Sequence, residues 1–374
     1  MTTINAPTAT VLLDEIRTIA SELRTRAPAS DRTGDLDVTA FERLRAAGVT
    51  AALVPHEFGG AGVTHAEMGE MLRVLGANDP AVAVTLAMHS HLVAAQVWRH
   101  HHEMDAEAFL RKVAAGTIAV STGASDWVAS NGAAVKVEGG FRVSARKSPA
   151  SGCEVGDLLV TSIKWPEAEP KVIHCAIPFT ADGVRIERTW DTLGLRATGS
   201  HTVVLDDVFV PDATVSLTRS ATQWHPVWNT VIGTALPLIM AAYVGIADAA
   251  VETALELTGG RSDDHVLQLV GEMLNEYTTG ADAVRAMFVD SDDLHFDNND
   301  ELAARTLGRK TVAADALIHT VRLAIEVVGG IGYTRAHPLE RLYRDVHGCL
   351  FHPLPRAKQA RFTGRVALGL PPIE

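Results

Sequence analysis

Residues 189–211 read TWDTLGLRATGSHTVVLDDVFVP, and this stretch decides the fold of the chain. Its first half is rich in turn-forming residues, with glycines at Gly194 and Gly199. Its second half alternates small or polar residues with apolar ones and ends in a proline, which indicates a β-strand. The acidic pair Asp206 and Asp207 falls inside that pattern, so we expect a turn or bulge there.

On both sides of this stretch the spacing of apolar residues becomes helical. Helices are predicted over residues 8–27, 39–47 and 65–75, and a fourth begins at Asp79-Pro80. From about Thr117 the period is two, which predicts a series of strands. After Pro211 helices are predicted over 227–258, 262–290 and 303–328, with a shorter one from about Pro355. The acidic segment 288–302 is interpreted as a solvated connection.

This order predicts an α+β fold in which helices and strands are segregated. We expect an N-terminal helical domain over residues 1–115, a middle antiparallel β-domain over 116–215 and a C-terminal four-helix bundle over 216–374. The middle domain would hold the ligand cleft.

Composition excludes several classes of function. Of the 374 residues 47% are hydrophobic and 21% charged, which is ordinary for a globular enzyme. The net charge of −12 and the lack of a basic cluster argue against nucleic-acid binding. Three cysteines without C-x-x-C spacing fit a reducing cytosol. The first residues do not resemble a secretory signal, and no long uninterrupted apolar run predicts a membrane span. A cytoplasmic location is therefore expected.

The fourth helix carries two histidines, His89 and His91, on different faces. Isolated histidines in helices usually have structural roles, and this interpretation weighs more for His91 than for His89. The alternative is that one of them lies at a ligand cleft. The run of histidines that ends this helix is interpreted as an ordinary C-terminal cap.

Two strings resemble the acyl-CoA dehydrogenase superfamily. In the opening stretch, Trp190, Gly194, Arg196 and Ser200 match W-x-x-x-G-x-R-x-x-x-(S/T) before a strand ending in V-P. Residues 327–346, VVGGIGYTRAHPLERLYRDV, resemble the family's G-G-x-G-Y…P-x-E-R-x-Y-R-D motif at nearly every defining position. The resemblance extends from about residue 40 to the end of the chain.

The resemblance implies a flavin cofactor, FAD or FMN, and the residues that bind it. Arg196 and Ser200 would lie beside the substrate. The glycine-rich loop would contact the adenosine end of the flavin, often across a dimer interface. The positions that match the family's flavin contacts are Thr122, Ser125, Ser151, Arg261, Gln268, Gly329, Gly330, Gly332 and Tyr333. No metal is expected.

The catalytic positions depart from the family. Acyl-CoA dehydrogenases use a glutamate to remove the α-proton of a thioester, and that position falls on Pro353 here. Another position used by a minority of the family falls near Ala235, which also has no carboxylate. His352 could serve as the base instead, because an imidazole suits proton transfer at neutral pH. A structural loop histidine is the alternative. Glu326, which replaces a glutamine before the double glycine, disfavours phosphates nearby and keeps FMN open.

The resemblance leaves three functions open. The family's base rate favours dehydrogenation of an acyl-CoA-like thioester, with an electron-transfer flavoprotein as partner. Flavin-dependent monooxygenases of the same fold lack the glutamate, carry histidines near this loop and often end in L-P-P, as residues 370–372 do here. In such an enzyme His352 and His89 would act on oxygen transfer, and a flavin reductase would be the partner. A catalytically inactive assembly subunit is the third. In each case a homodimer or homotetramer is expected.

Overall fold

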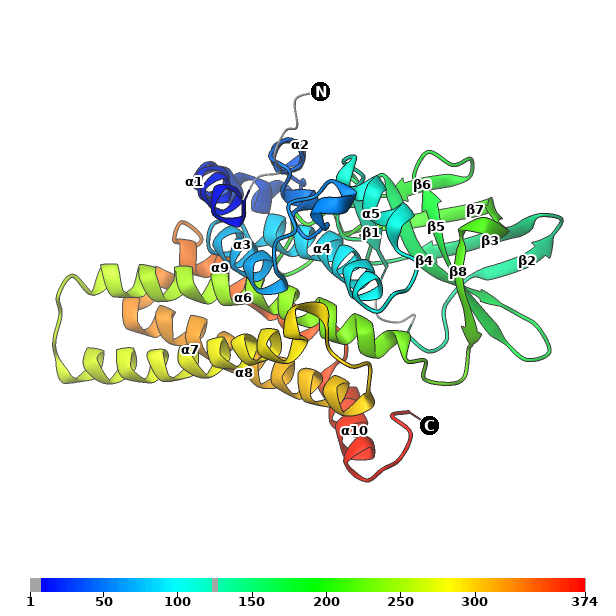
Figure 1. Cartoon of the computed structure of the whole chain (residues 1–374). Coiled ribbons are helices and arrows are strands. Elements are labelled where there is room, and N and C mark those ends of the chain that lie inside the picture. The colour runs from blue at the N-terminus through cyan, green and yellow to red at the C-terminus, as the bar shows by residue number, and fades with distance from the viewer. Residues whose placement is uncertain (1–7, 123–126, 374) are drawn as a thin grey trace.

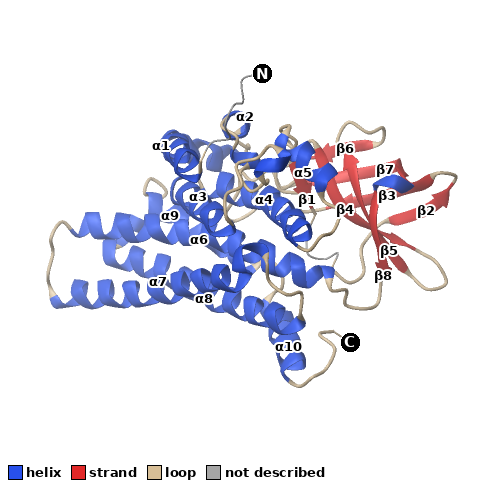
Figure 2. Cartoon of the chain, in the orientation of Figure 1, coloured by secondary structure: helices blue, strands red, loops and turns tan. Residues whose placement is uncertain are grey.

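A computed structural model describes residues 8–122 and 127–373 (Figure 1). Helices make up the two ends of the chain, and strands make up its middle, as the sequence predicts. Figure 2 shows that the strands gather at one end of the molecule and the long helices at the other. The N-terminal helices are α1 (Ala9–Thr33), α2 (Val38–Ala46), α3 (His65–Asn78), α4 (Pro80–His101) and α5 (Glu107–Ala114).

Local signals explain where these helices begin and end. Thr64 and Glu67 form a capping box at the start of α3, and the Asp79 side chain accepts two backbone N–H groups at the start of α4. Helix α1 ends later than the predicted residue 27. The residue that ends it is Gly34, whose left-handed backbone conformation (φ 77°) follows the last helical residue, Thr33. Helix α5 was not predicted.

The middle region consists of two four-stranded sheets. The strands are β1 (Ala119–Ser121), β2 (Ala133–Val137), β3 (Gly140–Lys147), β4 (Leu158–Trp165), β5 (Lys171–Pro178), β6 (Val184–Glu187), β7 (Thr202–Pro211) and β8 (Val215–Ser220). The sheet orders are β1-β4-β5-β8 and β2-β3-β7-β6. Every pair is antiparallel except the parallel pair β1–β4. Because β8 pairs with β5, the β region extends past the predicted boundary at residue 215, to Ser220.

The bulge expected in the opening stretch is present in β7. Its register against β3 shifts between Val143 and Ala145, and Asp207 has φ 52°. A positive φ is uncommon outside glycine, and aspartate tolerates it better than most residues. The bulge leaves the acidic side chains Asp206 and Asp207 exposed while Val208 returns to the core.

The C-terminal helices are α6 (Val227–Thr258), α7 (Asp264–Ser291), α8 (Asp300–Val328), α9 (Pro338–Val346) and α10 (Arg356–Ala367). The prediction that segment 288–302 is merely solvated is wrong. Leu294 and Phe296 in it are buried, and the Asp293 carboxylate accepts the backbone N–H of His65 at 2.7 Å. Apolar side chains within the acidic run therefore anchor this connection to the N-terminal helices.

Helices α4 and α6 lie at the centre of the molecule (Figure 1). Both are long and apolar enough to span a membrane, but 78% of the most apolar window of α4 and 94% of that of α6 are buried inside the fold. The core that encloses them explains their composition. Buried polar side chains on these two helices are therefore the first candidates for a site.

Candidate active site

His89 is locked between backbone groups. Its Nε2–H donates to the carbonyl oxygen of Thr50 at 2.8 Å, and its Nδ1 accepts the backbone N–H of Ala119 at 3.0 Å. These contacts fix one neutral tautomer, and burial lowers the pKa of the ring further below its usual range. Both ring nitrogens are engaged, so the geometry does not support the prediction that His89 acts on a reactant.

His91 has a free ring nitrogen instead. It is 7% exposed, and its Nε2 lies 3.0 Å from the Ser121 hydroxyl oxygen. That hydroxyl donates to the carbonyl of Met88 at 3.4 Å, so it accepts the Nε2–H of His91. The buried Nδ1 is then a bare lone pair, and it has no hydrogen-bond partner in the described part of the chain.

His352 lies in the C-terminal part of the chain, between α9 and α10. Its Nε2 lies 2.8 Å from the hydroxyl of Tyr243 on α6, and its carbonyl accepts a hydrogen bond from Lys310 Nζ on α8 at 2.9 Å. Tyr243 is 0% exposed, and burial raises its pKa well above the usual range, so it keeps its proton. Among the described contacts His352 is the one acceptor for that proton. The Nδ1 of His352 is therefore the protonated nitrogen.

Both imidazoles are neutral at pH 7. Burial, and then the neighbouring His89 ring, lower the pKa of His91 to about 4. Burial, then Lys310 and His91, lower the pKa of His352 to about 3. The pair thus offers one acceptor, His91 Nδ1, and one donor, the Nδ1–H of His352. Sequence reasoning rated His91 as structural and did not single out Tyr243 or Lys310, since a polar residue in an apolar helix gives no distinct signal.

No carboxylate within the described ranges hydrogen-bonds or pairs with either imidazole. Ala235 is buried on α6 and Pro353 follows His352, so both positions expected for the family's glutamate are without an acid. Asp345 is the nearby buried acid. Its carboxylate accepts the backbone N–H of Leu195 at 2.6 Å, which ties α9 to the opening stretch.

Hydroxyl groups of the middle region form a network beside α4. The hydroxyl of Ser200 donates to that of Ser151 at 2.8 Å and lies 2.6 Å from that of Thr198. Thr85 on α4 donates to the Thr198 carbonyl at 3.1 Å. Short hydroxyl-rich segments of this kind can hydrogen-bond the polar edge of a flavin. Two of the predicted positions, Ser151 and Ser200, are thus brought together.

The remaining middle-region positions are placed differently. The Thr122 hydroxyl lies 2.8 Å from that of Thr161, and Ser125 lies outside the described residues. Arg196 faces the end of α1, where its Nε donates to the carbonyl of Asp31 at 2.9 Å. The predicted role of Arg196 in substrate binding therefore has no support from its contacts, which are structural.

The predicted contacts to the far end of the flavin lie apart from this cluster. Arg261 belongs to the α6–α7 turn and Gln268 to the beginning of α7, and Figure 1 shows this turn at the end of the bundle remote from the sheets. In the glycine-rich loop, a Cβ added at Gly330 would meet no atom of the chain within 4 Å, and Tyr333 is 81% exposed. Within a single chain, the α6–α7 turn and the glycine-rich loop do not form one site with Ser151. Their exposure fits a cofactor or a second copy at this loop.

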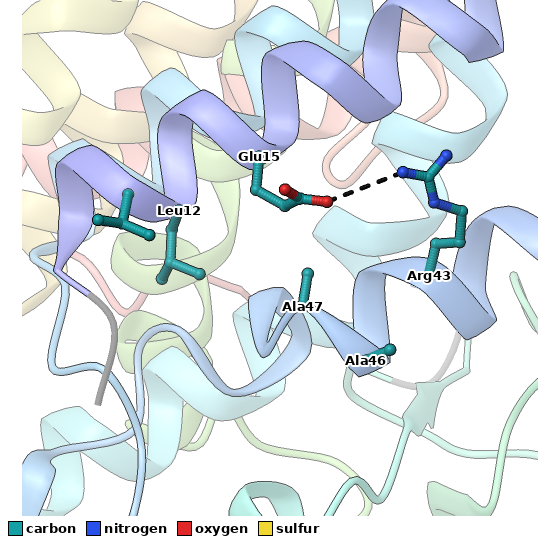
Figure 3. Close-up of a pocket in the computed structure, with 6 residues that line it drawn as sticks. Leu12, Glu15, Arg43, Ala46 and Ala47 are labelled. Carbon is teal, nitrogen blue, oxygen red and sulfur yellow. Dashed lines mark ion pairs between the residues drawn. The ribbon is translucent and has the colours of Figure 1, made fainter. Parts of the chain in front are cut away.

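A shallow pocket between α1 and α2 is not a competing site. Leu12, Ala46 and Ala47 line it together with the pair formed by Glu15 and Arg43, 3.8 Å apart (Figure 3). Both charged side chains are partly exposed and paired, and the other lining residues are small or apolar. None of the predicted site residues lies there.

Two family models that match this chain describe domains of the same family. The model of the acyl-CoA dehydrogenase N-terminal domain matches residues 7–117, and that of the C-terminal domain matches residues 230–349. The amino sugar nitrososynthase DnmZ of Streptomyces peucetius is 30% identical over 97% of this chain and 94% of its own length. The putative acyl-CoA dehydrogenase YdbM of Bacillus subtilis (strain 168) is 27% identical over 91% of this chain and 92% of its own.

Among solved structures, KijD3 in complex with FMN and dTDP-3-amino-2,3,6-trideoxy-4-keto-3-methyl-D-glucose superimposes with a TM-score of 0.87. It is 27% identical, and the match covers 98% of this chain and 96% of KijD3. The chain is thus similar over nearly its whole length both to a putative acyl-CoA dehydrogenase and to proteins whose names or bound ligands include an amino sugar.

Proposed function

This chain belongs to the acyl-CoA dehydrogenase family of flavin-dependent oxidoreductases, and we propose that it oxygenates the nitrogen of a primary amine with reduced flavin and O₂. The observation that carries this proposal is a pair of neutral imidazoles, the buried His91 and the half-buried His352, neither of which has a carboxylate partner among the described residues. The similarity to DnmZ and KijD3 supports an amino sugar as the substrate class.

The same pair argues against dehydrogenation of an acyl thioester. Removing a weakly acidic α-proton needs a base with substantial proton affinity. A pKa of about 3 leaves the His352 imidazole neutral but makes it a weak base. Ala235 and Pro353 at the glutamate positions supply no base, and the Asp345 carboxylate accepts the backbone N–H of Leu195 and bonds to neither imidazole. We therefore do not retain the expectation that His352 is a dehydrogenase base.

The residues present fit a flavin. His91 Nδ1 is a buried polar atom without a partner, the Ser151 and Ser200 hydroxyls are clustered beside α4, and the Gly330 backbone is open to close approach. Ser151 and Thr122 would hold the ring system, and the Gly329–Tyr333 loop the distal end. Reduced flavin would supply two electrons with which O₂ gives one oxygen atom to the substrate and one to water.

The protein side of the reaction follows from the two tautomers. The amine lone pair forms the N–O bond while the O–O bond breaks, and the nitrogen must then lose a proton. His91 Nδ1 can take that proton although its ring is a weak base, because a protonated N–OH nitrogen is far more acidic than the α-carbon of a thioester. The Nδ1–H of His352 would hydrogen-bond the oxygen that departs with the O–O electron pair and leaves as water. Both roles require neutral rings before turnover, which burial ensures.

The partners follow from this chemistry. We propose a flavin reductase as the source of reduced flavin, in place of an electron-transfer flavoprotein. The exposed Ile331 and Tyr333 in the glycine-rich loop support a homodimer or homotetramer in which this loop meets a neighbouring chain. The cytoplasm is the proposed location.

The test compares two reactions on the same preparation. Protein supplied with reduced FAD or FMN and O₂ should add one oxygen atom to amines from a panel of nucleotide-linked amino sugars, as mass spectrometry of the products would show. Under anaerobic conditions an acyl-CoA panel should leave oxidised flavin unbleached. Bleaching by an acyl-CoA would instead establish a dehydrogenase, and an absence of both reactions with flavin bound would favour the assembly subunit.

A further inference from the structure

Lys310 is a buried cation that the mechanism above does not use. It lies on α8, is 2% exposed, and donates from Nζ to the backbone carbonyl of His352 at 2.9 Å. An ammonium group has three N–H donors, and this is its single hydrogen bond within the described residues. No described carboxylate pairs with it. Burying an ammonium without a counter-ion is costly, and burial accordingly lowers the pKa of Lys310 below its usual range.

Among the described groups, Cys349 and Asp315 raise the pKa of Lys310, but neither forms an ion pair with its ammonium. Asp315, on the same helix, pairs with Arg356 at 2.8 Å, which compensates its charge. Burial raises the pKa of the Cys349 thiol to about 12, so that group is neutral. Tyr243 keeps its proton on the α6 side, and His91 is uncharged on the α4 side.

Among the described residues, a second acid in this neighbourhood is Asp345 on α9. Its carboxylate is turned to the Leu195 N–H, and burial raises its pKa to about 7. At neutral pH it therefore carries only part of a charge, which lies near Arg341 and Arg344. After burial, Lys310 is the first contribution that lowers the pKa of His352, and its Nζ is bonded to the His352 carbonyl.

We propose that Lys310 is a positioning residue of the oxygenase: its ammonium holds the His352 carbonyl, and its charge, which no described carboxylate pairs with, adds to burial in keeping the His352 imidazole neutral, so that the site admits an amine only in its uncharged form. This inference rests on the proposed function and adds the ionisation state of the substrate. A fixed cation repels a protonated amine, and only the neutral nitrogen has the lone pair that forms the N–O bond.

The first experiment needs no flavin and no substrate. Imidazole titration followed by NMR in the apoprotein, with the His352 signal identified by its loss in His352→Gln, should show no protonation of wild type above pH 5. Lys310→Met and Lys310→Gln should raise the His352 pKa by about one to two units, since they remove a nearby charge. Lys358→Met, an equal charge change at an exposed position of α10, is the matched control and should leave the titration unchanged.

The second experiment uses wild-type holoenzyme and a series of primary amines of different basicity. The inflection of kcat/KM against pH should follow each amine's own pKa, with activity rising as the amine deprotonates. Lys310→Arg should retain this behaviour. Lys310→Gln, which keeps a donor but loses the charge, should flatten the dependence on amine basicity.

The outcomes separate the two proposals. If no amine is oxygenated, the proposed function fails, while the NMR titration still judges the effect of Lys310 on His352. If amines are oxygenated but the inflection stays at one pH for all of them, selection of the neutral amine is wrong. An unchanged His352 pKa in a folded Lys310→Gln protein overturns the assigned role of Lys310, and wild-type titration near pH 6.5 would do so without any variant.

Discussion

His89 and His91 are two positions apart on α4, and yet they have different chemical capacity. His89 uses both ring nitrogens on backbone groups of Thr50 and Ala119. His91 uses one on the Ser121 hydroxyl and keeps the other as an unshared lone pair. A histidine can act on a reactant only through a nitrogen that the protein leaves open. The difference follows from the partners that each side chain meets.

Substitution of these two histidines should separate catalysis from stability. His91→Gln should lower kcat for amine oxygenation by about a hundredfold or more, because it removes the proton acceptor, while flavin still binds. His89→Gln should instead lower the denaturation midpoint, because it disturbs the link between α4, Thr50 and β1. Steady-state kinetics and urea unfolding on both variants check this. Equal kinetic losses per folded molecule would contradict the assignment.

At the scale of elements, α3 and α6 pack closely because glycines face the neighbouring backbone. A Cβ added at Gly76 would lie 2.2 Å from the carbonyl oxygen of Ala242, and one at Gly245 would lie 2.1 Å from that of Arg73. Such distances exclude any side chain without a backbone shift. The close approach also aligns Arg73 with Asp248, where Nε and the carboxylate are 2.6 Å apart. Helix α6, which carries Tyr243, is thereby fixed against the N-terminal helices.

The effect of a glycine-to-alanine substitution on stability should therefore depend on whether the glycine faces a neighbouring backbone. Gly76→Ala should destabilise the fold by about 1–3 kcal/mol, the usual cost of overpacking. Gly271→Ala on α7, where an added Cβ meets nothing within 4 Å, should be neutral or stabilise by about 0.5–1 kcal/mol. Chemical denaturation measures both. A Gly76→Ala protein as stable as wild type would show that the two helices separate easily.

At the scale of the whole molecule, neutral histidines lie at buried or half-buried positions in the helical parts and in the β region. Burial lowers the pKa of His65 and His91 to about 4, and that of His174 and His352 to about 3. These four rings come from the N-terminal helices, the β region and the C-terminal part. They share a physical consequence, since the unfolded chain binds protons at these positions more readily than the folded chain does.

Stability should therefore fall in acid. In the unfolded chain these histidines have pKa values of about 6.5. Below that pH the unfolded state gains protons that the folded state does not bind, so the free energy of unfolding decreases as pH falls from about 6.5 toward 4. Each histidine contributes up to about 1.4 kcal/mol per pH unit in that window.

Asp345 acts in the opposite direction. Its pKa is raised to about 7, so the folded state binds its proton more tightly than the unfolded chain does. Four histidines should outweigh this one acid. Urea unfolding between pH 4 and pH 8 would reveal the trend, and stability that is constant or rises toward pH 4 would contradict it.

Much of the fold could be predicted from residue types and their spacing. The switch from helical period to period two near Thr117, and its reversal after Pro211, predicted the α–β–α order, and residues 227–258 were predicted with the bounds that α6 has. The motif over residues 327–346 indicated the family that the comparisons confirm. These signals are local, because burial on one face of an element repeats along the sequence with the element's own period.

The candidate site depended on tertiary contacts. Absence of a glutamate at Pro353 and Ala235 could be seen in the sequence, and so could His352 as a candidate. The choice of His91 over His89 could not, because it depends on Thr50, Ala119 and Ser121, which the chain brings to α4 from distant positions. Lys310 gives no sequence signal either. Whether a buried nitrogen is bonded or free, and whether a buried charge is cancelled, is decided by groups that meet only when the chain has folded.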